Sequence, residues 1–383
     1  MSKFNLNKSS AVAKVNGRFF GKKRTAAFIT TILIAATAML LCTACSGGTK
    51  ARLITDGASL ILSPDNLTIN VTAITENGFA VTVEGCTEKT LASGTETTLH
   101  AQGTAVILKG KITALYCQDN QLTALNVQGL NALQGLDCND NQLTELNTQG
   151  LSALQWLFCQ GNQLTELNAQ GCPALQWLWC YDNRLTTLNV QNLSALQELF
   201  CQGNQLTELD VQGCTALHEL NCNNNQLTTL NVQECSTLRR LSCGNNKLTA
   251  LNVQGLNALQ VLSCGNNRLT FLNVQGCTAL HELECEHNQL TSLNVQGCTA
   301  LRSLDCSNNQ LSAQALTSLL TGLPAQSPSD NAKCILYTES SGEGTLMDFT
   351  ASAELYAVFQ NAKTKNWRLY CITGNSDGND VEL

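Results

Sequence analysis

The chain has 383 residues, of which 43% are hydrophobic and 13% are charged, and its formal net charge is −7. A nucleic-acid partner requires clustered Lys and Arg, so this balance predicts no binding to nucleic acid. Length alone would allow two ordinary globular domains, but a periodic tract occupies about half of the chain and makes a count by length misleading.

The first 45 residues have the composition of an export signal. Residues 1–24 contain no acidic residue and precede an apolar run over residues 26–41; their basic residues are Lys3, Lys8, Lys14, Arg18, Lys22, Lys23 and Arg24. Small residues before Cys45 and a Ser/Gly stretch after it resemble a bacterial lipobox, with Cys45 as the lipidated residue. We therefore expect a lipoprotein signal peptide over residues 1–45 and a tether over residues 46–52. The alternative is an uncleaved signal anchor, although the 16-residue run is short for a bilayer of about 30 Å.

Residues 53–112 are predicted to form a small β domain. Apolar and polar residues alternate in short segments such as Phe79 to Val83, and turn sequences such as Asn77-Gly78 separate these segments. The first repeat of a stack would otherwise expose its apolar core and an unpaired strand edge. We therefore expect this domain to cap the N-terminal end of the periodic tract.

Residues 113–311 contain ten cysteines at an unbroken spacing of 21 residues, each followed three positions later by Asn: Cys117, Cys138, Cys159, Cys180, Cys201, Cys222, Cys243, Cys264, Cys285 and Cys306. The frame around Cys138 is Leu-x-x-Leu-x-Cys-x-x-Asn-x-Leu-x-x-Leu, the leucine-rich-repeat pattern with Cys in place of one Leu. Such a short unit cannot bury its own apolar face. The pattern predicts an α/β-type solenoid dominated by β structure, with about ten repeats and a parallel concave sheet. Each strand should point its Leu and Cys inward, while the Asn amide satisfies buried backbone groups of the neighbouring turn.

The cysteine ladder is expected to consist of free thiols. Residues 21 apart occupy equivalent places on parallel strands about 4.8 Å apart, whereas a disulfide needs its Cβ atoms about 3.8 Å apart with a skewed torsion. A second set of cysteines shares its repeat position with Leu and is interpreted in the same way: Cys172, Cys214, Cys235, Cys277 and Cys298. The repeats supply no convergent Cys and His ligands, so no metal site is expected.

Beyond Leu311 the repeat ends, and residues 312–383 predict a βα cap. Ser312 and Asp348 are the predicted helix N-caps, and Pro324 follows the first helix. The expected elements are a helix over 312–323, a strand over 334–337, a helix over 349–363 and a strand over 367–373. These elements would extend the sheet and close the C-terminal end of the stack.

The motif Leu-x-Cys-x-x-Asn-Gln-Leu-Thr at residues 115–123, with its successors up to residue 311, resembles the 21-residue leucine-rich repeats of bacterial surface proteins. The likeness is greatest to internalin-type proteins with a cysteine ladder and to lipid-anchored repeat proteins of host-associated anaerobes. It implies surface display and adhesion to ligands of host or neighbouring cells, including mucin-like glycoproteins. The chain differs from the internalins in its N-terminal lipobox and in showing no C-terminal cell-wall sorting motif, so a different anchor is expected. The resemblance is specific for the fold but says little about the ligand.

The outward residues of the strands, taken in register, include a cluster of rings on one face of three adjacent strands: Trp156, Phe158, Trp177, Trp179, Tyr181 and Phe200. We call these six residues the aromatic patch. They include three of the four Trp of the chain, and such exposed clusters commonly mark binding sites. Sugar rings could stack on the indoles, with Gln160, Gln202 and Asp182 near their hydroxyl groups, and a protein ligand would use the same anchors. The alternative is that the rings pack on one another, or under a flap from the N-terminal domain, and stabilise the sheet.

Glu282, Glu284 and Glu286 alternate along one strand beside His287, and we call these three carboxylates the acidic patch. Their mutual repulsion would favour a cation or a basic partner, but one strand supplies too few converging oxygens for calcium, so solvated charge is the preferred interpretation. The four His of the chain accompany no nucleophile motif, phosphate loop or zinc motif. We therefore expect no enzymatic activity, no metal and no cofactor.

Together these features predict a monomeric protein, lipid-anchored to the bacterial envelope and displayed at the outer-membrane surface. It would bind a protein, glycoprotein or glycan through the aromatic patch and contact the membrane through its lipid anchor only. The alternative is a structural envelope scaffold that binds other envelope proteins and has no host ligand. The sequence identifies neither the ligand nor the side of the membrane.

Overall fold

The computed structural model describes residues 51–338, 352–372 and 380–383. The expected signal peptide with Cys45, and the tether up to residue 50, lie outside these residues. Among the described residues, no helix combines the length and the apolar character needed to cross a bilayer.

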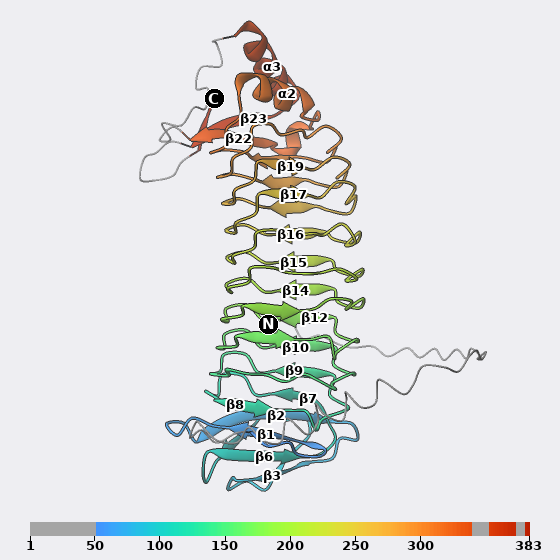
Figure 1. Ribbon diagram of the computed structural model, residues 1–383, viewed down its shortest axis with the longest axis vertical. Coiled ribbons are helices and arrows are strands. Elements are labelled where there is room, and N and C mark those ends of the chain that lie inside the picture. Colours follow the sequence, from blue (N-terminus) through green and yellow to red (C-terminus); the bar gives the residue numbers. More distant parts are fainter. Residues whose placement is uncertain (1–50, 339–351, 373–379) are drawn as a thin grey trace, which may run out of the picture. The chain divides into compact units, whose positions relative to one another are not determined.

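The described residues build a 15-stranded sheet in which the short strands of successive repeats stack one above another (Figure 1). Its first repeat strand is β7 (Ile112–Tyr116), and three-residue strands follow: β9 (Gly135–Asp137), β10 (Trp156–Phe158), β12 (Trp177–Trp179), β14 (Glu198–Phe200), β15 (Glu219–Asn221), β16 (Arg240–Ser242), β18 (Val261–Ser263), β20 (Glu282–Glu284) and β21 (Ser303–Asp305). These strands pair in parallel, and the central Leu157 of β10 lies opposite Leu136 and Leu178. The constant repeat length therefore fixes the register along the whole stack.

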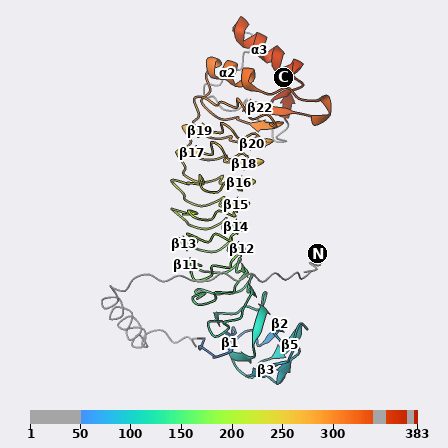
Figure 2. The same cartoon turned by 90° about the vertical axis from the view of Figure 1, so that its right-hand side faces the viewer.

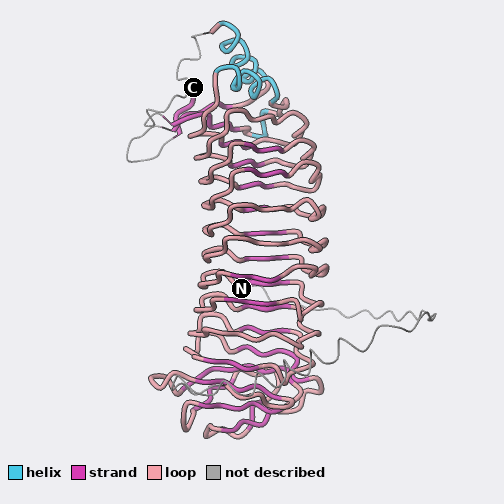
Figure 3. The backbone as a smooth tube through the Cα atoms, in the orientation of Figure 1, coloured by secondary structure: helices cyan, strands magenta, loops and turns pink. Residues whose placement is uncertain are grey.

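The opposite side of the coil carries only short extended pieces, joined by the loops drawn in Figure 3. They form two-stranded sheets from β11 (Glu166–Asn168) with β13 (Thr187–Asn189) and from β17 (Ala250–Asn252) with β19 (Phe271–Asn273). Figure 2 shows β11 and β13 across the coil from β12 and β14. The repeats thus confirm the predicted β-dominated solenoid, since their segments are too short for a regular helix.

Stacked Leu and Cys side chains form the core. All ten ladder cysteines are buried as free thiols, as is the second set of cysteines. Several of the second set use the thiol as a hydrogen-bond donor: Cys214 Sγ donates to Val190 O at 3.3 Å and Cys277 Sγ to Val253 O at 3.2 Å. A buried Cys therefore packs like a small Leu and also satisfies a backbone carbonyl.

The Asn after each strand forms a second ladder inside the coil. Asn204 Nδ2 donates to Cys180 O at 3.0 Å and to Cys201 O at 3.1 Å, and its Oδ1 accepts from Leu185 N at 2.9 Å. The first member, Asn120, instead exchanges hydrogen bonds with the backbone of Asn70 at 2.8 Å in each direction. The Asn ladder satisfies buried backbone groups from turn to turn, as predicted, and also joins the repeats to the preceding strands.

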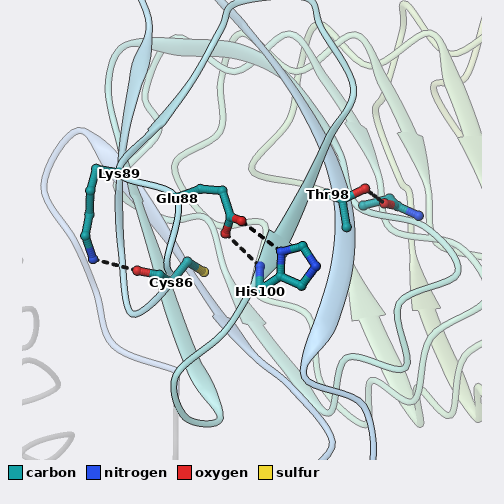
Figure 4. A network of polar contacts seen from close by, with 6 residues as sticks. Cys86, Glu88, Lys89, Thr98 and His100 are labelled. Carbon is teal, nitrogen blue, oxygen red and sulfur yellow. Dashed lines mark hydrogen bonds and ion pairs between the residues drawn. The ribbon is translucent and has the colours of Figure 1, made fainter.

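The segment before the repeats contains β1 (Gly57–Ile61), β2 (Thr68–Thr75), β3 (Val81–Glu84), β4 (Thr90–Leu91), β5 (Thr97–His100) and β6 (Ala105–Lys109). One five-stranded sheet has the order β4-β3-β6-β1-β8, where β8 is Ala124–Asn126, and β2 pairs antiparallel with β7 to continue the long sheet. Figure 4 shows how a turn of this segment is held: Glu88 accepts from the backbone N of His100 and contacts its Nδ1, both at 2.8 Å. Lys89 Nζ donates to Cys86 O at 2.6 Å.

After the repeats, α2 (Ala313–Gly322) begins at the N-cap Ser312, whose Oγ accepts from Ala315 N at 3.2 Å. The elements that follow are η1 (Pro328–Asp330), β22 (Lys333–Thr338), α3 (Ala353–Thr364), β23 (Arg368–Ile372) and β24 (Asp380–Glu382). Strands β22 and β23 extend the sheet in parallel beyond β21, and β24 pairs antiparallel with β23. The expected N-cap Asp348 lies outside the described residues. Helix α3 begins four residues later than predicted, because Ser352 Oγ accepts from Leu355 N at 3.1 Å and caps it.

Candidate ligand-binding face

The strand register brings the aromatic patch onto the outward face of β10, β12 and β14. Trp156 pairs with Trp177, and Trp179 pairs with both Phe158 and Phe200. The central Leu of each strand is buried, whereas the flanking rings are half-buried, as the alternation of a strand requires. Tyr181, which follows a ladder cysteine, is also half-buried.

Five rings contact one another in a continuous row, which we call the aromatic ladder: Tyr116, Trp156, Phe158, Trp179 and Phe200. The ring centroids of Tyr116 and Trp156 are 5.3 Å apart, as are those of Trp156 and Phe158. Phe158 stacks on Trp179 at 4.4 Å, and Trp179 stacks on Phe200 at 5.5 Å. The rings thus do pack on one another, yet all remain half-buried. Among the described residues, Trp177 and Tyr181 make no ring contact with this row.

Tyr116 is not a member of the predicted aromatic patch, because β9 lies between its strand, β7, and β10. Gly135 on β9 removes that separation, since a Cβ atom there would lie 1.8 Å from Cζ2 of Trp156. The indole therefore lies over Gly135 and reaches Tyr116. The sequence feature that could have predicted this contact is Gly135, which occupies the same outward column as Trp156 and leaves space beside the indole.

Several buried polar atoms along this face lack hydrogen-bond partners within the part of the chain that the structure describes. They are the Oε1 atoms of Gln118, Gln160 and Gln202, Nε1 of Trp179 and, farther along the face after β20, Oε2 of Glu286. Gln160 is only 7% exposed, and an unsatisfied buried polar group costs about 1–3 kcal/mol. Asp182, expected beside Gln160 and Gln202, is exposed.

Asp137 on β9 lies between Tyr116 and Phe158 in the strand register. The pKa of its carboxyl is raised to about 6, mainly by burial and to a smaller extent by the charges of Asp119 and Asp140, against the lowering effect of a hydrogen bond from the backbone N of Asn139. The ion pairs of the described residues join other partners, all in residues 76–111. Within the described part of the chain, no cation therefore forms an ion pair with this carboxylate.

The acidic patch lies on the same sheet face, at β20. Glu282 and Glu284 flank a buried Leu, and Glu286 leans over Gly265, where a Cβ atom would lie 1.9 Å from its Oε1. Burial raises the pKa of Glu286. Within the described residues, no three His, Cys, Asp or Glu side chains converge to hold a metal ion.

A family model for leucine-rich repeats, in two copies, matches residues 194–234. The protein is a leucine-rich-repeat solenoid. It is similar to the functional domain of InlJ from Listeria monocytogenes, which includes a cysteine ladder: identity is 33%, the TM-score is 0.51, and the match covers 59% of this chain and 49% of that one. The chain thus spans about half the length of that domain. No curated protein sequence matches it significantly.

Two further solved structures match the chain at lower similarity. The leucine-rich-repeat protein LIC12759 of Leptospira interrogans is 29% identical, with a TM-score of 0.45 and coverage of 50% of this chain and 56% of that one. The effector YopM of Yersinia pestis is 24% identical, with a TM-score of 0.44 and coverage of 52% and 61%. Repeat solenoids create extended concave surfaces that they use for binding.

Proposed function

We propose that this protein is a cell-envelope binding module that holds a protein or glycoprotein ligand on its aromatic ladder and on the neighbouring Trp177. The observation that carries the proposal is the row of half-buried rings bordered by buried polar atoms without partners. A bound ligand would cover the rings and pair with those atoms.

Ring pairing alone gives the aromatic ladder little net stabilisation, which favours a ligand over a purely structural role for the rings. Cross-strand ring pairs stabilise a sheet by about 0.2–1 kcal/mol each, which the unpartnered atoms of Gln160 and Trp179 offset. The fourth tryptophan has the features of a structural residue: Trp367 is 2% exposed, and its Nε1 donates to Pro324 O at 2.8 Å. On the sheet face, by contrast, the buried Nε1 of Trp179 has no hydrogen-bond partner among the described residues, and Trp is a residue type enriched in interface hot spots.

The export signal and the lipobox support placement of this module at the cell envelope. In this proposal Cys45 carries the lipid, the membrane is contacted through that lipid only, and the monomeric solenoid is displayed at the outer-membrane surface. The resemblance of the repeats to those of internalin-type surface proteins supports such display.

The test replaces Trp156, Trp177 and Trp179 together by Ala and measures binding to cells, to mucin and to a protein and glycan array. Each hot-spot Trp contributes about 2 kcal/mol or more, so binding should weaken at least 100-fold while circular dichroism stays unchanged. A matched control replaces Ser242, Ser263 and Ser303 on the same face by Ala. Unaltered binding by the Trp variant would refute the proposal. A silent array with co-purifying envelope proteins would instead support the structural scaffold.

A further inference from the structure

The outward columns of strands β7 to β14 contain carboxylates but no Lys or Arg. Their residues are Ala114, Tyr116, Gly135, Asp137, Trp156, Phe158, Trp177, Trp179, Glu198 and Phe200. The first basic residue in these columns is Arg240 on β16. The face around the aromatic ladder is therefore aromatic and negatively charged.

Asp137 is a charged residue within the row of rings, because its strand neighbours on both sides are Tyr116 and Phe158. The titratable groups that influence it or feel its charge are acidic or neutral: Asp119, Asp140, Tyr116, Tyr181 and the buried thiols of Cys117, Cys138 and Cys159. The carboxyl pKa of about 6 agrees with this lack of a compensating cation. An external cation at this place would find both a counter-charge and aromatic faces.

Four buried polar atoms in the repeats of β7 to β14 lack hydrogen-bond partners among the described residues, and most of them are acceptors. Three of them are glutamine Oε1 atoms, of Gln118, Gln160 and Gln202, and one is a donor, Trp179 Nε1. Gln160 is more than nine-tenths buried between its neighbours, so bulk water does not readily satisfy it. A peptide with donor-only cationic side chains and a backbone carbonyl matches this set, whereas each sugar hydroxyl brings two acceptor lone pairs for every O–H that it donates.

We infer that the aromatic ladder binds an extended cationic peptide segment, with an Arg or Lys side chain on the ring faces beside Asp137. This inference rests on the proposed function and names the ligand chemistry of the same site. A planar guanidinium stacks on indole rings and donates several N–H bonds, so Arg fits better than Lys. The ladder crosses the strands from β7 to β14, about 19 Å at ~4.8 Å per strand, which corresponds to about six extended residues.

The test titrates the full-length protein with octa-arginine, octa-lysine and octa-citrulline peptides and follows Trp fluorescence. Three of the four Trp lie in the aromatic patch, so the signal reports mainly on binding there. Citrulline keeps the shape of Arg but lacks its charge. Octa-arginine should bind at least tenfold more tightly than octa-citrulline and somewhat more tightly than octa-lysine, and its affinity should fall with added salt. Equal binding of octa-arginine and octa-citrulline, or no binding of any cationic peptide, would overturn the inference.

Variants separate recognition at the ladder from general attraction to an acidic protein. Asp137→Asn should weaken octa-arginine binding about tenfold, whereas the matched double variant Glu282→Gln, Glu284→Gln should leave it within twofold. The inference would be contradicted if the double variant, rather than Asp137→Asn, weakened octa-arginine binding. If a neutral glycan from the array lost binding in the triple Trp variant but not in Asp137→Asn, the proposed function would stand and this inference alone would fall.

Discussion

Strands β7 to β14 form the aromatic half of the repeat sheet, and strands β15 to β21 form its polar half. The two halves have similar interiors but different outward side chains. Both halves bury one Leu and one Cys per strand and carry the same Asn ladder. Outward, the aromatic half carries seven rings, whereas the polar half carries Glu219, Asn221, Arg240, Ser242, Val261, Ser263, Glu282, Glu284, Ser303 and Asp305. Because strand residues alternate between the two faces, inward positions specify the fold while outward positions vary independently.

The largest expected effect tests whether the two halves share one cooperative interior. Burial raises the pKa of Cys159 in the aromatic half and of Cys222 in the polar half from 9.0 to about 12. The pKa of each thiol is higher in the folded than in the unfolded protein, so the contribution of these thiols to stability is fully present below pH 9. As the pH rises toward 12, the free energy of unfolding falls by up to about 1.4 kcal/mol per thiol per pH unit. Several such thiols together should unfold the protein under reducing conditions between pH 9 and pH 11.

Tryptophan fluorescence reports that alkaline transition in the aromatic half, and alkylation of Cys264 and Cys285, followed by mass spectrometry, reports it in the polar half. Coincident midpoints are expected. Midpoints that differ by more than one pH unit would show that the halves unfold separately.

The next effect compares equivalent members of the Asn ladder. Asn204→Ala and Asn246→Ala should each lower the free energy of unfolding by about 3 kcal/mol, since each leaves two strand carbonyls and one backbone N–H without a partner. Urea unfolding measures both, with the exposed Gln205→Ala as a control expected within about 0.5 kcal/mol of wild type. Costs that differ by much more than 1 kcal/mol would mean that the interiors are not equivalent.

A smaller effect is a difference in stability between substitutions at Gly135 and Gly265, the two glycines that lie under outward side chains. Gly135→Ala should destabilise the protein by about 2 kcal/mol, because its methyl group would collide with the rigid indole of Trp156. Gly265→Ala should cost less than about 1 kcal/mol, because the flexible carboxylate of Glu286 can move away. Thermal unfolding measures the difference, and a Trp emission change is expected for Gly135→Ala only. Equal costs would argue against the close indole contact.

The smallest expected effect is a gain in stability. The folded pKa of Asp137, about 6, is raised above its ordinary 3.8, so the contribution of this carboxyl is present below pH 3.8 and is lost as the pH rises through 6. Asp137→Asn cannot ionise and should stabilise the protein by about 1 kcal/mol at pH 8, after allowance for solvent screening, with no gain near pH 3. Urea unfolding at both pH values checks this. A loss of stability at pH 8 would reveal a compensating partner for the carboxylate.

The candidate site was predictable in its placement but not in its contacts. The register of Trp156, Trp177 and Trp179 follows from counting 21 residues, and the structure has it as predicted. The contact of Trp156 with Tyr116 does not follow from counting, because it depends on which way the indole turns once Gly135 leaves space beside it. The same limit applies to Trp177, which shares the face but not the ladder.

The sequence by itself determined the solenoid, its strand register, the buried thiols and the Asn ladder, because identical repeats must present identical positions to one another and only stacking buries their Leu and Cys. Only the tertiary structure decided the continuous aromatic ladder, the burial of Asp137 and the start of α3 at Ala353. Those features depend on side-chain directions and local capping, which neighbouring strands and turns impose and which a repeating pattern does not encode.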